Sequence, residues 1–442
     1  METTPICQKR TTCRICGSHN LRPVFDLGEQ CLASIFEPDA SPGRLRRRYP
    51  LTLVRCAEPN GCGLLQLGHS ISPRVLYRHY GYRSGINELM RRNLIDIALT
   101  AQEMVDLRPG DTVCDIGCND GTFLEAFTSS RVDRLGIDPA ENVIRSARDK
   151  GLDVLCDFFS RSVYEKARPA VKSKIVASIA MFYDLDDPDG FVRDVAAVLA
   201  DEGVWVMEMA YFPFMLKNNA FDAICHEHLG YYCLRQLEWL FDRHRLHIHR
   251  LEFNDINGGS IRLFIRKDSA GPPPISTRRT LACIRAEEAS LRLDSDRPYE
   301  TFYRAVLTVR QDLTRLLEEI ISRGETVYAY GASTKGNTLL QFCGIDHRLV
   351  RKAADRNPEK WASRTPATGI EIISEQQARE EKPDYFLVLP WSFISIFKER
   401  EAAFLRQGGK FILPLPAVRV FGKNGQQASE TGIRSFDLPA DL

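Results

Sequence analysis

The segment that begins at Asp111 constrains the fold most, because short apolar stretches alternate there with glycine loops and helical patterns. "DTVCDIG" predicts a strand, "CNDG" a glycine loop and "TFLEAF" the start of a helix. Further apolar runs follow at regular intervals, in "RLGIDP", "KIVASIAMFY" and "GVWVMEM". Strands that alternate with helices form parallel sheets covered by helices. This pattern predicts the α/β fold class.

A second alternating run follows a long helical pattern at about 299–323. It begins with the strand "TVYAYGAS" and the helix "TKGNTLLQFC", and continues to "DYFLVLPW" and "KFILPLP". A chain of 442 residues is also too long for one ordinary core. We therefore expect a cysteine-rich module over 1–73, a central α/β domain with a leading helical segment over 74–270, and a C-terminal α/β domain over 271–442.

Charge and hydropathy exclude several functional classes. Lys and Arg total 59 against 58 for Asp and Glu, a net charge of +1 that argues against a nucleic-acid-binding surface. No window approaches the length of a membrane span, and the N-terminus lacks the apolar core of a signal peptide. A cytoplasmic protein is expected, in which the 13 cysteines are metal ligands, buried apolar groups or reactive thiols before disulfides.

Two cysteine pairs in the first module have the pattern of a metal site. Cys13-x2-Cys16 has the common tight spacing, and Cys56-x5-Cys62 is a stretched second pair in which Cys31 or His69 could replace one member. Four thiolates suit a tetrahedral structural Zn²⁺, and a small module with little apolar core needs such a crosslink. Four scattered buried cysteines are the alternative, and the pairing favours zinc.

The first glycine loop has the features of a cofactor site. In "VCDIGCNDGTF", Asp115-x-Gly117 ends a strand and leads into a helix, so a ligand can approach both the backbone and the helix N-terminus. Asn119 and Asp120 stand where a dinucleotide fingerprint needs a second glycine, so a pyrophosphate fits poorly. Asp115 suits a cationic amino-acid group better than a phosphate.

Later strand ends supply the rest of a nucleoside site. Asp138 lies 21 residues after Gly117 at the end of the next strand, where a carboxylate holds ribose hydroxyls. Asp157 and Phe158 near the end of the third strand suit an adenine edge and face, and Met181 follows the fourth strand. A glycine turn in an unrelated α/β domain is the alternative. Together these residues favour S-adenosylmethionine (SAM) over NAD.

The segment "CHEHLGYY", from Cys225 to Tyr232, admits three interpretations: a metal site, a base with a supporting group, or a polar patch. In the zinc protease motif HExxH the second histidine stands four positions after the first, whereas here His228 stands only two positions after His226. The segment follows a predicted fifth strand, and ligand sites gather beyond the carboxyl ends of such strands. This position favours catalysis.

With these motifs together, the chain resembles the nucleotide-sugar C-methyltransferases, bacterial enzymes that methylate C-3 of a 4-keto-6-deoxyhexose carried on a nucleoside diphosphate. The resemblance covers nearly the whole chain. It rests on the order of the cysteine module and five further motifs, which are "YGYRSGINELM", "VCDIGCNDGTFL", "CHEHLGYY", "NDINGGSIRLFI" and "YGASTKGNTLL".

The resemblance implies a zinc ion in the N-terminal module and a C-terminal domain that closes over the substrate. It implies that His228 is the base, that Glu227 contacts or orients the sugar, and that Tyr80 or Tyr82 places a hydroxyl beside it. His226 belongs to the same substrate-binding segment. The chemistry is consistent, because removal of the proton next to a ketone gives an enolate that can attack a methyl donor, and imidazole has a suitable pKa.

Two positions depart from the family pattern. Cys225 stands where relatives often have tyrosine, and "AMFYDLDDP" offers Tyr183 and Asp184 where some relatives carry a histidine after the fourth strand. Both changes alter the expected sugar pocket.

Two glycine-containing turns are expected to contact the substrate. "YGASTKG" has Ser333 and Lys335 at a strand-to-helix turn, where they could bind the sugar's diphosphate or form a structural turn. "INGGS", with Asn257 and Gly258, has the same choice, and the resemblance favours substrate contact.

The sequence thus predicts a SAM-dependent sugar C-3-methyltransferase with a structural Zn²⁺ and a TDP- or GDP-linked substrate, acting as a monomer or small homo-oligomer without nucleic-acid or membrane partners. A small-molecule O- or N-methyltransferase is the first alternative. A zinc-module nucleic-acid-binding protein with a degenerate SAM fold is the second.

Overall fold

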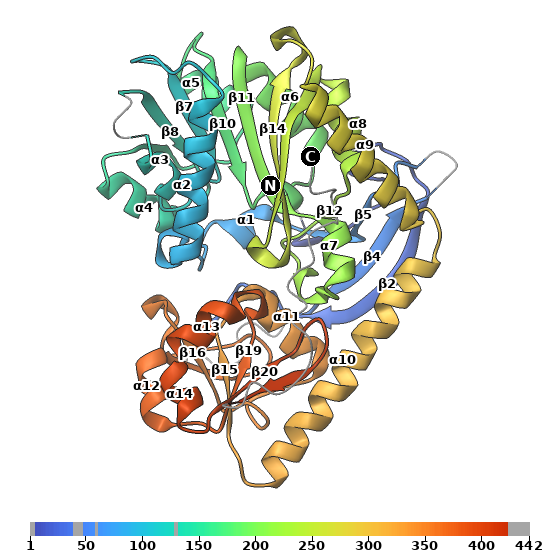
Figure 1. Ribbon diagram of the computed structural model, residues 1–442, viewed down its shortest axis with the longest axis vertical. Coiled ribbons are helices and arrows are strands. Elements are labelled where there is room, and N and C mark those ends of the chain that lie inside the picture. Colours follow the sequence, from blue (N-terminus) through green and yellow to red (C-terminus); the bar gives the residue numbers. More distant parts are fainter. Residues whose placement is uncertain (1–4, 39–46, 58–60, 128–130, 423–442) are drawn as a thin grey trace.

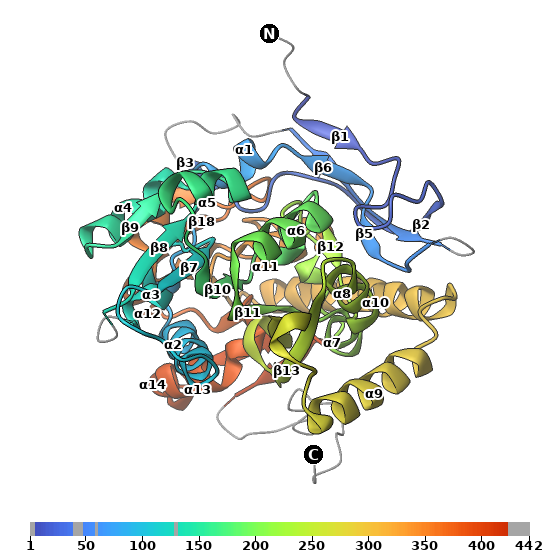
Figure 2. The same cartoon turned by 90° about the horizontal axis from the view of Figure 1, so that it is seen from above.

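The structure is a computed structural model that describes residues 5–38, 47–57, 61–127 and 131–422. Two α/β bodies lie one above the other, and a small β-rich module packs along one side of both (Figures 1 and 2). The long helix α10 (Arg297–Ser322) runs down the same side and leads from the upper body into the lower one (Figure 1). The α/β fold class predicted from the sequence is confirmed.

The upper body is built on a seven-stranded sheet. In spatial order its strands are β13 (Leu246–Asn254), β14 (Ser260–Lys267), β11 (Leu199–Ala210), β10 (Ser173–Ile179), β7 (Thr112–Ile116), β8 (Asp133–Ile137) and β9 (Asp153–Leu155). The five strands from β7 to β11 in chain order are mutually parallel, and β14 pairs antiparallel with β11. The strand order reverses between β7 and β10, which is where ligands bind in open parallel sheets.

Helices cover both faces of this sheet because each presents an apolar stripe to it. One face is covered by α2 (Glu88–Glu103), α3 (Thr122–Glu125) and α4 (Glu141–Asp149). The other face is covered by α5 (Arg161–Ala167), α6 (Pro188–Val198), α8 (Leu234–Arg243) and α9 (Ile275–Ser290).

The lower body has a sheet of eight strands. In spatial order they are β21 (Arg419–Phe421), β20 (Lys410–Leu413), β19 (Tyr385–Val388), β15 (Val327–Tyr330), β16 (Lys352–Asp355), β18 (Glu371–Ser374), β17 (Ser363–Arg364) and β3 (Glu37–Pro38). The five central strands, β20 to β18, are parallel. Its shorter helices are α11 (Thr334–Cys343), α12 (Glu375–Glu381), α13 (Ile394–Arg400) and α14 (Ala402–Arg406).

The N-terminal module exchanges strands with both bodies. Its four-stranded sheet contains β2 (Leu21–Gln30), β4 (Tyr49–Cys56), β5 (Leu65–Leu67) and β12 (Gly230–Tyr231). A two-stranded sheet of β1 (Cys7–Lys9) and β6 (His69–Ile71) precedes α1 (Pro73–Tyr77). Strand β12 comes directly after the His-Glu-His segment, and β3 belongs to the sheet of the lower body. The predicted domain bounds at 73 and 270 stay a prediction. Strand β12 of the second predicted domain pairs with the first module, and strand β3 of the first module pairs with the lower body.

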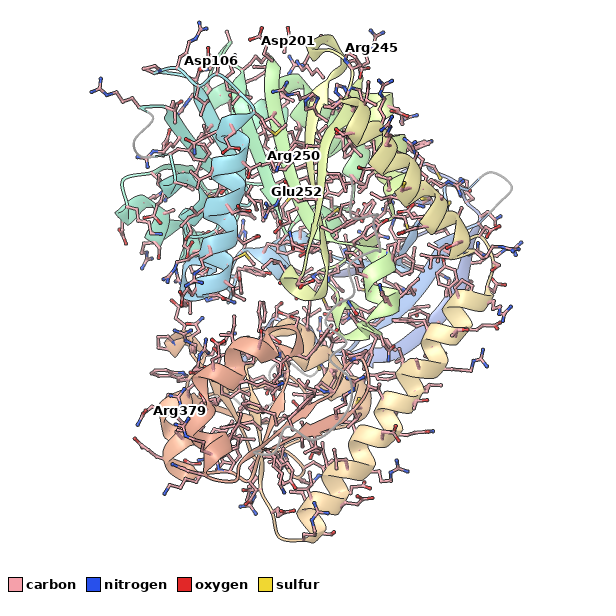
Figure 3. All side chains as sticks on the ribbon, viewed as in Figure 1. Asp106, Asp201, Arg245, Arg250, Glu252 and Arg379 are labelled. Atoms are coloured by element: carbon pink, nitrogen blue, oxygen red, sulfur yellow. The ribbon has the colours of Figure 1, made fainter. Side chains whose placement is uncertain are left out.

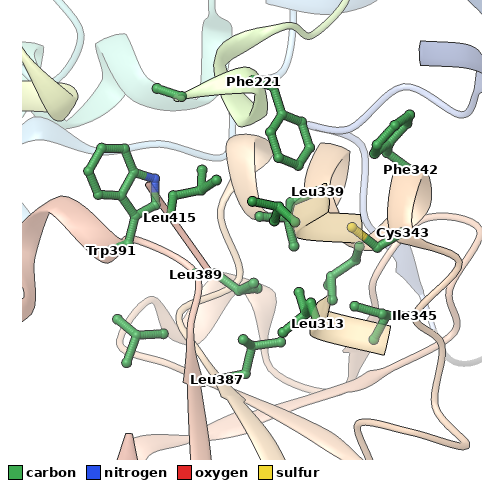
Figure 4. Packing of buried hydrophobic residues seen from close by; sticks show 14 of the residues in the cluster. Phe221, Leu313, Leu339, Phe342, Cys343, Ile345, Leu387, Leu389, Trp391 and Leu415 are labelled. Atoms are coloured by element: carbon green, nitrogen blue, oxygen red, sulfur yellow. The ribbon is translucent and has the colours of Figure 1, made fainter. Parts of the chain in front are cut away.

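A continuous apolar cluster joins the two bodies. The segments α7 (Phe212–Lys217) and η4 (Phe221–Ala223) of the upper body pack onto α11 and the lower sheet. The Phe221 and Phe342 rings meet edge-on with centroids 5.4 Å apart, and Leu339 lies beside them (Figure 4). Buried apolar contact of this kind fixes the relative position of the bodies.

The parallel strands of the upper sheet begin far from the lower body and end facing it. Asp106, Asp201 and Arg245, which stand near the starts of β7, β11 and β13, lie at the far end of the sheet (Figure 3). The carboxyl ends of β7, β8 and β10 therefore open toward the lower body. Across the described ranges, no helix combines the length and the apolar character that crossing a membrane requires.

Candidate active site

A cavity of about 690 Å³ lies between the two bodies. Its walls include the loops that follow β7, β8 and β10 of the upper body and those that follow β15, β16 and β19 of the lower body. The two sheets thus present their carboxyl ends to a shared space. Its size suits two small ligands that react with each other.

Asp115 and Gly117 form the part of the wall just beyond β7. Gly117 has φ +74°, and a Cβ there would stand 3.3 Å from the Met181 side chain, so only glycine leaves this space open. Burial, followed by the charges of Asp138 and Asp120, raises the pKa of Asp115 to about 8. A cation beside Asp115 would stabilise its ionised form.

Asp138 is held at the end of β8 by two backbone donors. Its Oδ2 accepts a hydrogen bond from the Asn119 N–H at 2.9 Å, and its Oδ1 accepts one from the Ala140 N–H at 2.8 Å. Burial raises its pKa, and the two N–H donors oppose that shift. The carboxylate lines the cavity, and each oxygen keeps a second acceptor site for a ribose hydroxyl.

Asn119 and Asp120 are turned mainly toward the tyrosine-containing segment 82–85. The Asn119 side chain accepts from the Ser84 N–H at 3.0 Å and donates to the Tyr82 carbonyl at 3.0 Å. Asp120 accepts from the Gly85 N–H at 2.7 Å and does not line the cavity. These two residues therefore position a wall of the site, which their place in the glycine loop did not indicate.

The expected adenine residues separate in the structure. Phe158 and Met181 line the cavity, and Phe159, which the sequence argument did not select, lines it as well. Asp157 is exposed and outside the wall, and its Oδ1 accepts a hydrogen bond from the Phe158 N–H at 2.8 Å. Two aromatic rings at this end can enclose a purine face.

Of the His226-Glu227-His228 segment, only His228 lines the cavity. Its Nδ1 lies 2.7 Å from the Ala223 carbonyl oxygen. Because a carbonyl only accepts, Nδ1 carries the proton and Nε2 carries the lone pair. Burial and then the charge of Lys335 lower the pKa of His228 to about 3, so the ring is neutral. The Tyr183 ring meets it edge-on at 4.4 Å and fixes its plane.

His226 and Glu227 are buried and do not line the cavity. The His226 Nε2 donates to the Tyr49 carbonyl of β4 at 3.1 Å, and its ring meets the Tyr49 ring edge-on. Glu227 is 2% exposed, and its backbone carbonyl accepts from the Tyr77 hydroxyl at 3.1 Å. Cys225 is also buried, and burial followed by the Glu227 charge raises the pKa of its thiol. None of the three lines the cavity.

The structure brings both predicted tyrosines to the cavity, together with a carboxyl group that the sequence argument left without a role. Tyr80 and Tyr82 line the wall, and Asn142 holds the Tyr80 backbone through hydrogen bonds of 2.9 and 2.8 Å. Asp184, in η3 (Phe182–Asp184) after β10, lines it too. Burial and then the Glu227 charge raise the pKa of Asp184 well above its usual value, which favours the protonated form that can donate a hydrogen bond.

The two glycine-containing turns meet across the boundary between the bodies. Asn257, in η5 (Ile256–Gly258), has φ +57°, and its carbonyl accepts from the Lys335 Nζ at 2.8 Å. The Ser333 Oγ caps α11 by accepting from the Gly336 N–H at 3.0 Å. Asn257, Ser333 and Lys335 all line the cavity. Gly258 lines a small adjoining pocket of about 20 Å³.

Asp355 is a site residue that the sequence argument missed. It ends β16 and lines the cavity, and it is held as Asp138 is held in the upper body. Its Oδ2 accepts from the Ala332 N–H at 2.8 Å, and its Oδ1 accepts from the Asn357 N–H at 2.8 Å. The signal was available, because "YGAS", a helix and then "KAAD" repeat the strand, glycine turn, helix and strand-end aspartate of the first half.

The four predicted zinc ligands come together away from this cavity. The Sγ atoms of Cys13 and Cys62 are 3.6 Å apart, those of Cys16 and Cys56 are 3.4 Å apart, and all four lie within 4.8 Å of one another. A tetrahedral zinc with Zn–S bonds of about 2.3 Å needs sulfurs roughly 3.8 Å apart. The cluster therefore fits Zn²⁺. Neither Cys31 nor His69 belongs to it.

The fold and these sites define a class of protein, a SAM-dependent methyltransferase with a structural zinc module. Family models match in the same order along the chain. A zinc binding domain matches 13–77, a methyltransferase domain matches 82–250, and a C-methyltransferase C-terminal domain matches 255–416. SAM and Zn²⁺, both predicted from the sequence, are confirmed as the cofactors.

The particular family follows from a full-length relative. The chain is 33% identical over 412 residues to the C-methyltransferase NovU of Streptomyces niveus, a match that covers 92% of this chain and 96% of that protein. The chain therefore belongs to the SAM-dependent C-methyltransferase family, as the order of its motifs predicted.

Other similarities are confined to part of the chain. A ubiquinone biosynthesis O-methyltransferase of Bordetella avium (strain 197N) is 35% identical over 108 residues, which are 24% of this chain and 44% of that protein. Among solved structures, one similar structure is the magnesium protoporphyrin IX methyltransferase ChlM of Synechocystis PCC 6803 with bound SAM. The match covers 40% of this chain and 79% of the ChlM chain. Its TM-score is 0.31 at 12% sequence identity.

Proposed function

We propose that this C-methyltransferase acts on C-3 of a nucleotide-linked 4-keto-6-deoxyhexose. The observation that carries the proposal is one cavity with two nucleoside-type ends and a neutral histidine in its wall. Asp138 stands at one end, after β8, and Asp355 stands at the other, at the end of β16. Each of these is the second strand of its α/β run, and His228 lines the same space. One end suits SAM, and the other suits a second nucleotide.

The reaction needs a base, because a sugar carbon is no nucleophile until it loses a proton. His228 Nε2 takes the proton from C-3, the C–H electron pair forms the C=C bond of the enolate, and the carbonyl π pair moves to O-4. When bound, SAM supplies an electrophilic methyl group whose bonding pair stays with sulfur. The enolate then forms the new C–C bond at C-3. Asp184 and the tyrosines provide hydrogen-bond donors around the sugar.

The nucleotide end has the groups that a sugar diphosphate requires. Gly331 follows β15 with φ +86° and leads to the N-terminus of α11, where free N–H groups can bind phosphate oxygens. Arg356 is exposed and lines the cavity next to Asp355, where its charge can neutralise the diphosphate. Asp355 then holds a ribose hydroxyl.

The test is a panel of TDP- and GDP-linked 4-keto-6-deoxyhexoses incubated with the enzyme and SAM, with products read by mass spectrometry. One added methyl on a panel member is expected. A parallel incubation in deuterated buffer should exchange the C-3 proton, which an O- or N-methyltransferase has no reason to remove. Absence of both methylation and exchange across the panel would exclude the proposed substrate class.

A further inference from the structure

Lys335 crosses from one body of the protein to the other. It lies in the first turn of α11 in the lower body, and its Nζ donates to the Asn257 carbonyl in η5 of the upper body at 2.8 Å. It lines the main cavity, and both it and His228 line the small pocket next to it. Lys335 therefore stands at the end of the cavity where the base is.

The groups around Lys335 are those of an active-site cation. Asp222 in η4 faces it, and Oδ2 of this aspartate accepts a hydrogen bond from the Trp391 Nε1 at 2.9 Å. Burial lowers the pKa of Lys335, and the charge of Asp222 opposes that shift. From the upper body, His228 faces it with the neutral ring described above. Trp391, in η8 (Trp391–Phe393), ties this arrangement to the lower body.

A diphosphate role, expected from the motif alone, does not explain this position. The α11 N-terminus and Arg356 already provide phosphate-binding groups on the lower body. The Lys335 ammonium instead reaches past them to a loop of the methyltransferase sheet. An ammonium has three N–H donors, so the bond to Asn257 leaves two for a ligand in the cavity.

We propose that Lys335 is a catalytic residue that donates a hydrogen bond to the substrate's keto oxygen and stabilises the negative charge of the enolate. This inference rests on the proposed function and assigns its electrophilic group. As His228 Nε2 takes the C-3 proton, the carbonyl π pair moves onto O-4, and the Lys335 ammonium lies against that oxygen. No proton leaves Lys335, so the charge balance at the site is unchanged.

Lys335 also has a second effect, on the base. Its positive charge lowers the pKa of His228, which keeps the imidazole neutral and able to accept a proton. Since Lys335 comes from the lower body, the base and the oxyanion donor are complete only where the two bodies meet. The apolar contact of Phe221 with Phe342 holds that geometry.

The experiment follows deuterium exchange at C-3 of TDP-4-keto-6-deoxyglucose with the demethylated cofactor SAH present, so that proton removal is measured without methyl transfer. Lys335→Met removes the charge at nearly constant length, and Lys335→Arg keeps it. Lys352→Met is the matched control, because Lys352 lies on β16 outside the cavity and pairs with Glu381 at 2.7 Å. SAM affinity and melting temperature are measured for each variant.

Exchange by Lys335→Met is expected to fall at least about 100-fold, the effect of removing one oxyanion donor, with SAM affinity retained. Lys335→Arg should recover part of the rate, and Lys352→Met should match the wild type. The exchange that remains in Lys335→Met should decline at a higher pH than in the wild type as the solution is made more acidic. The reason is that the pKa of His228 rises when the positive charge of Lys335 is removed.

Two outcomes separate the claims. If the wild type exchanges the proton and Lys335→Met exchanges it equally fast with the same pH profile, the role of Lys335 is wrong and the proposed function stands. If the wild type exchanges no proton from any 4-keto sugar of the panel, the proposed function fails, and the role of Lys335 fails with it. A fall in rate that comes with lost folding or lost SAM binding also contradicts a catalytic role.

Discussion

SAM binding is expected to release a proton from Asp115. In the free protein, burial and the charges of Asp138 and Asp120 raise the pKa of Asp115 to about 8. At pH 7 about ten molecules therefore hold a neutral Asp115 for each that holds the carboxylate. The ammonium group of SAM, placed against Asp115, favours the carboxylate, so binding shifts the carboxyl group to its ionised form.

The size of the effect follows from this pKa. The ionised fraction of Asp115 rises about ninefold between pH 6 and pH 7, so SAM affinity should rise by nearly the same factor. About 0.9 proton per chain should be released on binding at pH 7. SAM keeps its ammonium charge through most of this range, so the change belongs to the protein.

Isothermal titration calorimetry with SAH or SAM at pH 6 and pH 7, in buffers of different ionisation enthalpy, measures both affinity and proton release. Asp115→Asn should bind more weakly and lose the pH dependence. Asp157→Asn is the matched control, because Asp157 is exposed and lies outside the cavity wall, so its variant should keep the dependence. Equal affinity at both pH values without proton release in the wild type would refute the reasoning for Asp115.

Three further variants test other parts of the site. His228→Gln should lower kcat about 100- to 10,000-fold with SAM affinity retained, whereas His247→Gln on β13 should leave kcat unchanged. Cys13→Ser should lose zinc, measured by elemental analysis, and melt at least about 5 °C lower, whereas Cys7→Ser, outside the cluster, should keep its metal. Gly117→Val should weaken SAM binding in calorimetry, because a side chain at φ +74° is strained and its Cβ would stand 3.3 Å from Met181 in the cavity wall.

Residues whose position depends on backbone pattern were predictable from the sequence. Asp115 and Asp138 end neighbouring parallel strands, so their convergence follows from the strand and helix alternation. The pair Cys13 and Cys16 and the pair Cys56 and Cys62 could likewise be predicted to form one metal site, because four paired cysteines in a loop-rich module are typical of zinc binding.

Side-chain direction in irregular segments was not predictable. His226, Glu227 and His228 are consecutive, yet only His228 faces the cavity. Their directions depend on β12, which follows them and pairs with β5 more than 150 residues earlier in the chain. Asp120 differs from its neighbours for a similar reason, since it binds the Gly85 N–H of a distant segment. Such long-range pairing leaves no local pattern in a single sequence.

Lys335 illustrates the same limit on the C-terminal side. Its motif, a glycine turn before a helix, is typical of phosphate binding, and nothing local indicates that its Nζ reaches Asn257. That contact exists because Phe221 and Phe342 bring the two bodies together. The role of such a residue is visible only once the domains are placed against each other.

The position of the transferred methyl group tests the central claim most directly. The enzyme is incubated with SAM labelled with ¹³C in its methyl group and with the 4-keto sugar nucleotide that the panel identifies as substrate, and the product is examined by NMR. We predict a labelled methyl bonded to C-3 of the sugar, next to the ketone. A label on oxygen or nitrogen, or on any carbon not adjacent to the ketone, would contradict C-methylation through an enolate formed by His228.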